Sequence, residues 1–175
     1  MTVFHAVLAF VLLQRGGELL LARANTARLL AQGAIEIDRA GYKYFIVLHA
    51  AWLAAMFALV PAATPPHWPL LAAFSAVQLG RVWVIASLGR RWTTRLIVPR
   101  AAPAVTAGPY RWLDHPNYLI VAGEMAILPL AFAAVAIAVV FSACNALLLA
   151  RRIRLENATL GRPSYHIRET LPRRN

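Results

Sequence analysis

Residues 108–118 read GPYRWLDHPNY, and this stretch decides how the hydrophobic part of the chain is divided. Two prolines and a glycine within it prevent one continuous helix. Pro116 instead suits the first turn of a helix that begins near Asn117, because the missing N–H of proline has no partner to lose there. The segment also carries three aromatic rings, a histidine and two opposite charges, which a plain connector does not need. His115 is therefore expected at a helix mouth, where free N–H groups and the positive dipole end favour a carboxylate.

The composition around this stretch is that of a membrane protein. Hydrophobic residues make up 60% of the 175, charged residues only 14%, and the mean hydropathy is +0.58. The length suits a single domain, residues 1–175. A net charge of +11 is compatible with nucleic-acid binding, but the charges are segregated into loops, so we expect no nucleic-acid partner. Cys144 is the single cysteine, which excludes an internal disulfide, and no metal site is expected.

Three apolar runs in residues 1–88 are each expected to cross about 30 Å of hydrocarbon as a helix. The first has no basic residues before it and is expected to be a retained span rather than a cleaved signal. After it, apolar and charged residues alternate, which predicts a short helix lying in the interface with Asn25 as its N-cap. The three runs are residues 2–22, 45–60 and 70–88.

Residues 89–175 are expected to form a loop, a helical hairpin and a C-terminal helix. Residues 117–150 are too long for one perpendicular crossing, and Pro129 divides them, which predicts a tight hairpin of 117–129 and 131–150. The basic tail is expected to leave the membrane as a helix to about Leu160. The predicted fold class is therefore an all-α integral membrane protein with about five transmembrane helices, in which the loop and the C-terminal helix form a cytoplasmic cap.

The basic residues also predict the orientation. Residues 15–43 hold five Lys and Arg, residues 90–111 hold five and residues 151–174 hold seven, whereas residues 61–69 hold none. The positive-inside rule then places the amino terminus outside and the C-terminus in the cytoplasm.

A few polar side chains interrupt the apolar runs. An arginine at mid-bilayer costs on the order of 3 kcal/mol, so Arg81 is expected either to pair with Glu124 or Glu18 or to reach the interface. Arg15 and Glu18 share a helix face and form either a polar pocket wall or the interfacial end of the first span. Glu124 is either a general base for an acceptor hydroxyl or an ion-pair partner. His49 is expected to be a hydrogen-bonded packing residue.

The order GPY, HPNY, apolar hairpin and RIRLE, over residues 89–165, resembles the isoprenylcysteine carboxyl methyltransferase family of membrane enzymes. The N-terminal half, with QRGGELLLARANTARLLAQGAIE, resembles the bacterial branch that methylates alkylpyrones and phenolic lipids. The resemblance implies S-adenosylmethionine-dependent O-methyl transfer to a hydroxyl or carboxylate of a lipophilic acceptor in a bacterial inner membrane. It also implies that one set of residues surrounds the cofactor, namely Gly108, Tyr110, His115, Pro116, Tyr118, Arg154 and Glu156.

Two positions depart from the family pattern. Asp114 stands where the family usually has an arginine before His-Pro, so the role of that arginine is either vacant or passes to Arg111. Asn157 stands where a second glutamate is common. The candidate catalytic residues are therefore Glu124, Arg111 and Asp114.

Several other functions remain open from the sequence. A prenylcysteine or phospholipid-head methyltransferase would use the same site, and a nicotinamide-dependent sterol-type reductase has a similar C-terminal half. A non-catalytic membrane subunit would explain Asp114 and Asn157. The expected partners are a lipophilic acceptor and membrane lipids, with a lipid synthase as a candidate protein partner; the oligomeric state stays open.

Overall fold

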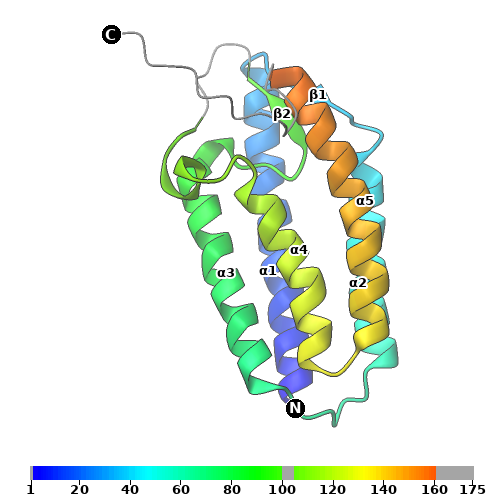
Figure 1. Ribbon diagram of the computed structural model, residues 1–175. Coiled ribbons are helices and arrows are strands. Elements are labelled where there is room, and N and C mark those ends of the chain that lie inside the picture. Colours follow the sequence, from blue (N-terminus) through cyan, green and yellow to red (C-terminus); the bar gives the residue numbers. More distant parts are fainter. Residues whose placement is uncertain (1, 100–104, 161–175) are drawn as a thin grey trace, which may run out of the picture.

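The computed structural model describes residues 2–99 and 105–160, and its helices lie side by side along one axis (Figure 1). Within these residues, four helices are long and apolar enough to cross a membrane, namely α1, α2, α3 and α5. α4 is a shorter apolar helix of 16 residues, about 24 Å long. The elements are α1 (Val3–Ala31), β1 (Ile35–Ile37), α2 (Tyr42–Leu59), α3 (Trp68–Leu88), the 3-10 turn η1 (Gly89–Arg91), β2 (Leu96–Val98), the 3-10 turn η2 (Gly108–Arg111), α4 (Pro116–Ala131) and α5 (Val135–Leu160).

The first helix is longer than the sequence predicts. α1 runs unbroken for 29 residues, so the expected interfacial helix with Asn25 as its N-cap is wrong. Asn25 lies inside α1 and is only 4% exposed. Its side-chain amide donates to the carbonyl oxygens of Trp92 at 2.8 Å and of Gly89 at 3.3 Å. These bonds attach the last turns of α1 to the loop after α3.

The end of α1 is fixed by a glycine in the left-handed region. Gly33 has φ of +82°, a conformation that residues with a Cβ rarely adopt. Its N–H donates to the carbonyl of Leu30 at 2.9 Å, and the N–H of Ala34 donates to the carbonyl of Leu29 at 3.0 Å. This pattern satisfies the last carbonyls of the helix and turns the chain out of it.

The hairpin of α4 and α5 turns in the same way, but without a glycine. Ala133 has φ of +57°, its N–H donates to Leu130 at 3.1 Å, and the N–H of Ala134 donates to Pro129 at 2.9 Å. The helix therefore ends after Ala131, a few residues beyond the proline that the sequence marked as the divider.

The bundle is mostly helical, consistent with the predicted all-α membrane class, and it carries one small sheet that the sequence does not predict. β1 pairs with β2 in an antiparallel register, with Glu36 opposite Ile97. Arg95 strengthens the pair through an ion pair with Glu36, with Nη1 3.1 Å from Oε1. The sheet joins the segment between α1 and α2 to the segment between α3 and α4.

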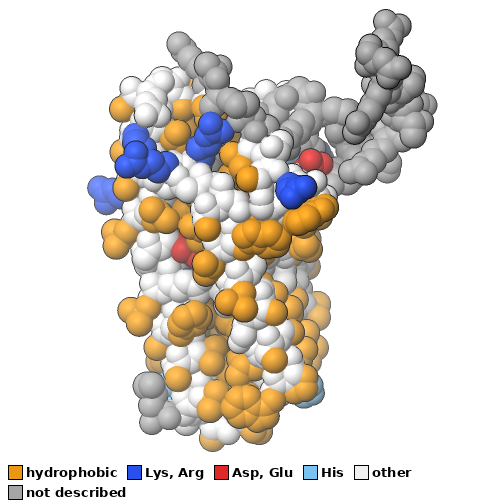
Figure 2. Space-filling view, turned by 90° about the vertical axis from the view of Figure 1, so that its left-hand side faces the viewer, with side chains coloured by type: hydrophobic (Ala, Val, Ile, Leu, Met, Phe, Trp, Pro, Cys, Tyr) orange, Lys and Arg blue, Asp and Glu red, His pale blue; other side chains and the backbone are white. Residues whose placement is uncertain are grey.

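The two ends of the bundle differ in charge. In Figure 1 the sheet lies at the end where α1, α3 and α5 finish, and the amino terminus lies at the opposite end. On the face shown in Figure 2, Lys and Arg gather near the sheet end, and hydrophobic side chains are spread over the surface below them. The apolar core packs toward the other end and includes Phe4, Trp52, Met56, Phe74, Met125, Leu128 and Phe132.

Candidate active site

A group of polar and aromatic side chains meets where α4 begins and α5 ends. Pro116 occupies the first turn of α4, as predicted, and His115 stands just before it. The rings of His115 and Tyr118 stack with centroids 5.2 Å apart and an interplanar angle of 17°. The Tyr118 hydroxyl donates to Oε2 of Glu156 at 2.5 Å, and Nδ1 of His115 lies 3.5 Å from the same oxygen. Nε2 of His115 contacts Oδ1 of Asn157 at 3.2 Å.

Arg152 is a further member of this group. Its Nε donates to the Tyr118 hydroxyl at 3.1 Å, and its Nη2 donates to the carbonyl of Thr94 at 2.9 Å. Its guanidinium lies 5.7 Å from the centroid of the Tyr118 ring and 5.2 Å from that of Phe45. We call His115, Tyr118, Arg152 and Glu156 the α4–α5 cluster.

The sequence motif pointed to Arg154 rather than Arg152. Arg154 is exposed on α5, and the contacts of the cluster come from Arg152 instead. Arg152 and Glu156 are four residues apart and share a face of the helix, whereas Arg154 is two residues from each. Helical spacing from Glu156 would have identified Arg152 from the sequence.

The loop before α4 is held close to α3 at Gly108. Gly108 has φ of +58°, and a Cβ at this position would lie 2.1 Å from the Ser87 hydroxyl oxygen. Both the backbone conformation and the lack of space require glycine here.

The other predicted residues of the loop lie at different depths. Tyr110 is partly buried; this burial raises its pKa to about 12, and the negative charge of Glu156 adds to the effect. Arg111 is exposed and lies 5.6 Å from the centroid of the Trp112 ring. Asp114 is exposed and lines a shallow pocket of about 330 Å³ beside the cluster. The structure therefore brings Tyr110 near Glu156 but leaves Arg111 at the surface.

A cavity of about 650 Å³ extends from the cluster down between α1 and α2. Along α2 it is lined by Tyr42, His49 and Phe57. At a rise of 1.5 Å per residue, each is about 10–12 Å from the next along the helix axis. Tyr118 and Arg152 line the upper part, and Leu8 and Leu12 of α1 line the lower part. The cavity is therefore polar at the sheet end and apolar toward the other end.

Apolar side chains that face the surrounding lipid also line this cavity. Leu12 is 51% exposed, Ile46 is 48% exposed and Phe57 is 67% exposed, and all three are lining residues. In a membrane their exposed surfaces face hydrocarbon. The lower cavity is therefore flanked by side chains that a lipid tail can contact.

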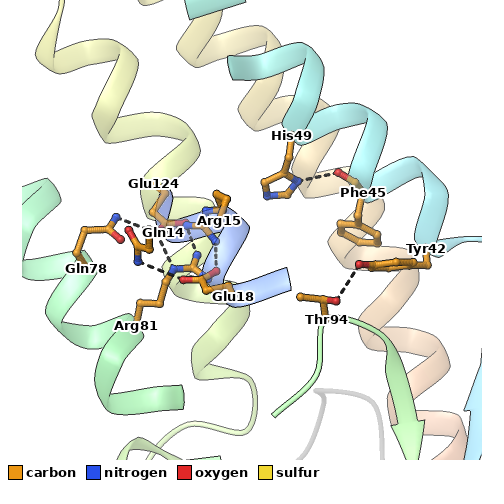
Figure 3. Close-up of polar contacts among 10 residues, drawn as sticks. All are labelled: Gln14, Arg15, Glu18, Tyr42, Phe45, His49, Gln78, Arg81, Thr94 and Glu124. Carbon is orange, nitrogen blue, oxygen red and sulfur yellow. Dashed lines mark hydrogen bonds and ion pairs between the residues drawn. The ribbon is translucent and has the colours of Figure 1, made fainter. Parts of the chain in front are cut away.

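The middle of the cavity borders a buried network of charged side chains from three helices (Figure 3). Arg15 donates to Oε2 of Glu18 and to Oε1 of Glu124, both at 2.7 Å. Arg81 donates through Nε to Oε1 of Glu124 at 2.7 Å, through Nη2 to Oε2 of Glu124, and through Nη1 to Oε2 of Glu18 at 3.3 Å. Gln78 donates to Oε1 of Glu124 at 2.8 Å. We call these five residues the buried network.

The buried network decides between the two positions that the sequence allows for Arg81. Its side chain is 2% exposed and paired with both Glu18 and Glu124, so the pairing alternative is confirmed and the interfacial one is wrong. Arg15 and Glu18 line the cavity, as the pocket-wall alternative predicts. Both oxygens of Glu124 accept hydrogen bonds from arginine, which favours its role as an ion-pair partner; its role as a general base stays a prediction.

A model of the isoprenylcysteine carboxyl methyltransferase (ICMT) family matches residues 70–162, more than half of the chain. The chain belongs to this family. The match begins in α3 and includes every residue of the α4–α5 cluster, and membership of the ICMT family indicates a membrane methyltransferase.

A relative of the whole chain is the uncharacterized protein YpbQ of Bacillus subtilis (strain 168). It is 36% identical over 162 residues, which cover 90% of this chain and 96% of that protein. The likeness thus extends to α1 and α2, outside the part that matches the ICMT family model. No solved structure matches the chain.

Proposed function

We propose that this protein is an S-adenosylmethionine-dependent O-methyltransferase that modifies a hydroxyl or carboxylate on a lipophilic acceptor within the membrane. An alkylpyrone or phenolic lipid is the acceptor we favour. The observation that carries the proposal is one cavity that is lined at its sheet end by Tyr118 and Arg152 of the α4–α5 cluster and continues into an apolar slot between α1 and α2.

The polar end of the cavity, together with Glu156 and His115 beside Tyr118, suits the parts of the cofactor. The Glu156 carboxylate can accept hydrogen bonds from an amine or ribose hydroxyl, and the Arg152 guanidinium can pair with a carboxylate. The stacked rings of His115 and Tyr118 offer flat surfaces for adenine. Oδ1 of Asn117 is buried, lines the cavity and has no hydrogen-bond partner within the described part of the chain, so it can accept a donor from a ligand. These residues fit an adenosyl group with an amino-acid head.

The chemistry follows from bringing the two substrates together. The cofactor supplies an electrophilic methyl group on a sulfonium. The chain has to hold the acceptor oxygen close to that methyl group and keep water away from both. The apolar lining from Leu8, Leu12 and Phe57 supports both tasks, because it can bind a hydrocarbon tail and excludes water.

The charge distribution supports a cytoplasmic cofactor site. The sheet end carries the basic loops, and the loop at residues 61–69 at the opposite end has no Lys or Arg. By the positive-inside rule the α4–α5 cluster faces the cytoplasm and the amino terminus lies outside, in a bacterial inner membrane. A lipid synthase that delivers the acceptor is the partner we propose.

Binding measurements on the detergent-solubilised protein test this function against its rivals. We expect S-adenosylmethionine to bind and NADPH not to bind, and Glu156→Gln to weaken cofactor binding about tenfold, the size of one charged hydrogen bond. Glu36→Gln, which removes a carboxylate from the sheet, is the control and leaves binding unchanged.

Transfer of a labelled methyl group into a host lipid extract then identifies the acceptor. Binding of NADPH alone would instead support a reductase, and binding of neither nucleotide would support a non-catalytic subunit.

A further inference from the structure

His49 lies in the middle of the cavity, with one ring nitrogen in a hydrogen bond and the other without a partner among residues 2–99 and 105–160. Its Nδ1 is 2.8 Å from the carbonyl oxygen of Phe45. A carbonyl oxygen only accepts hydrogen bonds, so Nδ1 must carry the hydrogen, and in the neutral ring Nε2 carries the lone pair. The expected packing bond of His49 is present, but it occupies only one of the two nitrogens.

The position of His49 is where the head of an acceptor would lie. It stands about two helical turns below Tyr42 and about two turns above Phe57 on the same face of α2. Figure 3 shows its ring projecting from α2 toward the buried network, and Arg15 lines the same cavity. The proposed cofactor end lies above this level and the apolar slot below it.

The charge at this level does not suit an anionic acceptor. Arg15 and Arg81 are each paired with Glu18 and Glu124, so two positive and two negative charges cancel. Among the described residues at this level, a carboxylate would find no uncompensated positive charge to replace its hydration. A neutral hydroxyl loses less hydration free energy than a carboxylate when it leaves water, and it can donate a hydrogen bond to a nitrogen lone pair.

We infer that Nε2 of His49 takes up the proton in the reaction. We also infer that the lipid group that receives the methyl is a hydroxyl and not a carboxylate. The inference rests on the proposed function. As the methyl group moves from the sulfonium, a C–O bond forms and the C–S bond breaks, leaving a neutral thioether. The hydroxyl O–H bond breaks and its proton moves to Nε2, which later releases it to water.

Other titratable groups face the same space, and they bear on any pH dependence. Those that line the cavity with His49 are Arg15 and Glu18 of α1, Tyr42 of α2, Arg81 of α3, Tyr118 of α4 and Arg152 of α5, and Glu124 of α4 lies behind them in the buried network. These groups are the same whichever methyl acceptor is bound, so their titration should affect the methylation of two acceptors alike. A pH effect that appears with only one of the acceptors is therefore assigned to His49.

The test uses two acceptors that differ only in the reacting group: a para-alkylphenol and the para-alkylbenzoate with the same alkyl chain. The wild type is expected to methylate the phenol. In His49→Gln, which keeps a similar size, transfer to the phenol should fall about 10²-fold or more, the usual contribution of a general base. Binding of S-adenosylmethionine should not change. An equal loss for both acceptors, or methylation of the benzoate alone, would overturn the assignment of His49 while leaving the proposed function intact.

A measurement on the wild type keeps the inference testable even if the variant does not fold. The rate constant kcat/KM for the phenol should rise through one ionisation between about pH 5 and 8, the range in which histidine loses its proton, whereas any transfer to the benzoate should stay flat. A flat profile for the phenol would contradict the role of His49. Failure to bind S-adenosylmethionine at all would instead overturn the proposed function.

Discussion

The buried network and the α4–α5 cluster are both polar groups in an apolar bundle, but they differ in how fully their charges are used. In the network the side chains of Arg81 and Glu124 are 2% and 4% exposed, and both oxygens of Glu124 accept from arginine. In the cluster the side chain of Glu156 is 20% exposed, and its Oε2 accepts a hydrogen bond from Tyr118 and lies 3.5 Å from Nδ1 of His115. The first arrangement joins helices, whereas the second leaves room for a ligand.

The largest effect should come from breaking the network. Arg81→Met leaves two buried carboxylates short of a partner, and we expect it to lower the free energy of unfolding by about 3 kcal/mol or more. Unfolding in mixed detergent micelles measures the change. Arg90→Met, at an exposed arginine of η1, is the control and should stay within about 0.5 kcal/mol of the wild type. Wild-type stability in Arg81→Met would mean that the network does not hold the bundle together.

The next effect tests the α4–α5 cluster, where the substitution of one arginine should alter cofactor binding more than stability. Arg152→Gln should weaken S-adenosylmethionine binding by about 10- to 100-fold, the range expected for a hydrogen bond to a charged group. Arg154→Gln removes the same charge two residues away from an exposed position and should change the affinity less than twofold. Equal losses in the two variants would show that only the net charge of α5 matters.

A titration tests whether Tyr110 belongs to the cluster. Burial and the charge of Glu156 raise its pKa to about 12, above the value near 10 of an unfolded chain. The folded protein then holds this proton while the unfolded chain loses it, so stability should be constant below pH 10 and fall between about pH 10 and 12. Tyrosinate absorbance should show the raised pKa, and Glu156→Gln should lower it, whereas Glu36→Gln should leave it in place.

The smallest effect on stability is expected from an ion pair at the surface, because its charges stay in contact with water, unlike those of the buried network. Arg151 donates to Asp38 at 2.5 and 2.7 Å, and these hydrogen bonds lower the pKa of the Asp38 carboxyl. The pair should therefore stabilise the fold above about pH 4 and lose its effect as the pH falls through the lowered pKa.

Asp38→Asn tests this pair with little change to the backbone, because asparagine also tolerates the φ of +55° at this position. The free energies of unfolding of the wild type and of Asp38→Asn should differ only slightly at neutral pH and should become equal in acid. A large difference at neutral pH would show that this pair is more than a surface contact.

The features that the sequence predicts are those that local chemistry determines. Pro116 was predicted at the first turn of α4 because of its missing N–H. Arg81 was expected either to pair with Glu124 or Glu18 or to reach the interface, because an arginine in the bilayer is costly, and the pairing alternative holds. The family followed from the order of its motifs, which the match to residues 70–162 confirms.

The features that the sequence misses depend on distant partners. α1 continues past residue 22 to Ala31, and there Asn25 bonds to the carbonyl of Trp92, 67 residues away, a contact that no local pattern reports. β1 and β2 have three residues each, too few for an alternating pattern to be visible. Arg152 was missed for a different reason, since the motif was carried over by order and not by helical spacing.

The exposed apolar side chains beside the cavity have a kinetic consequence. If an acceptor reaches the site sideways from the bilayer between α1 and α2, its effective concentration is its mole fraction among the lipids, not its amount per volume of buffer. Diluting it with an inert phospholipid should then slow methylation, whereas enlarging the aqueous volume at constant cofactor concentration should not. The lateral slot would make turnover a two-dimensional process fed by diffusion within the leaflet.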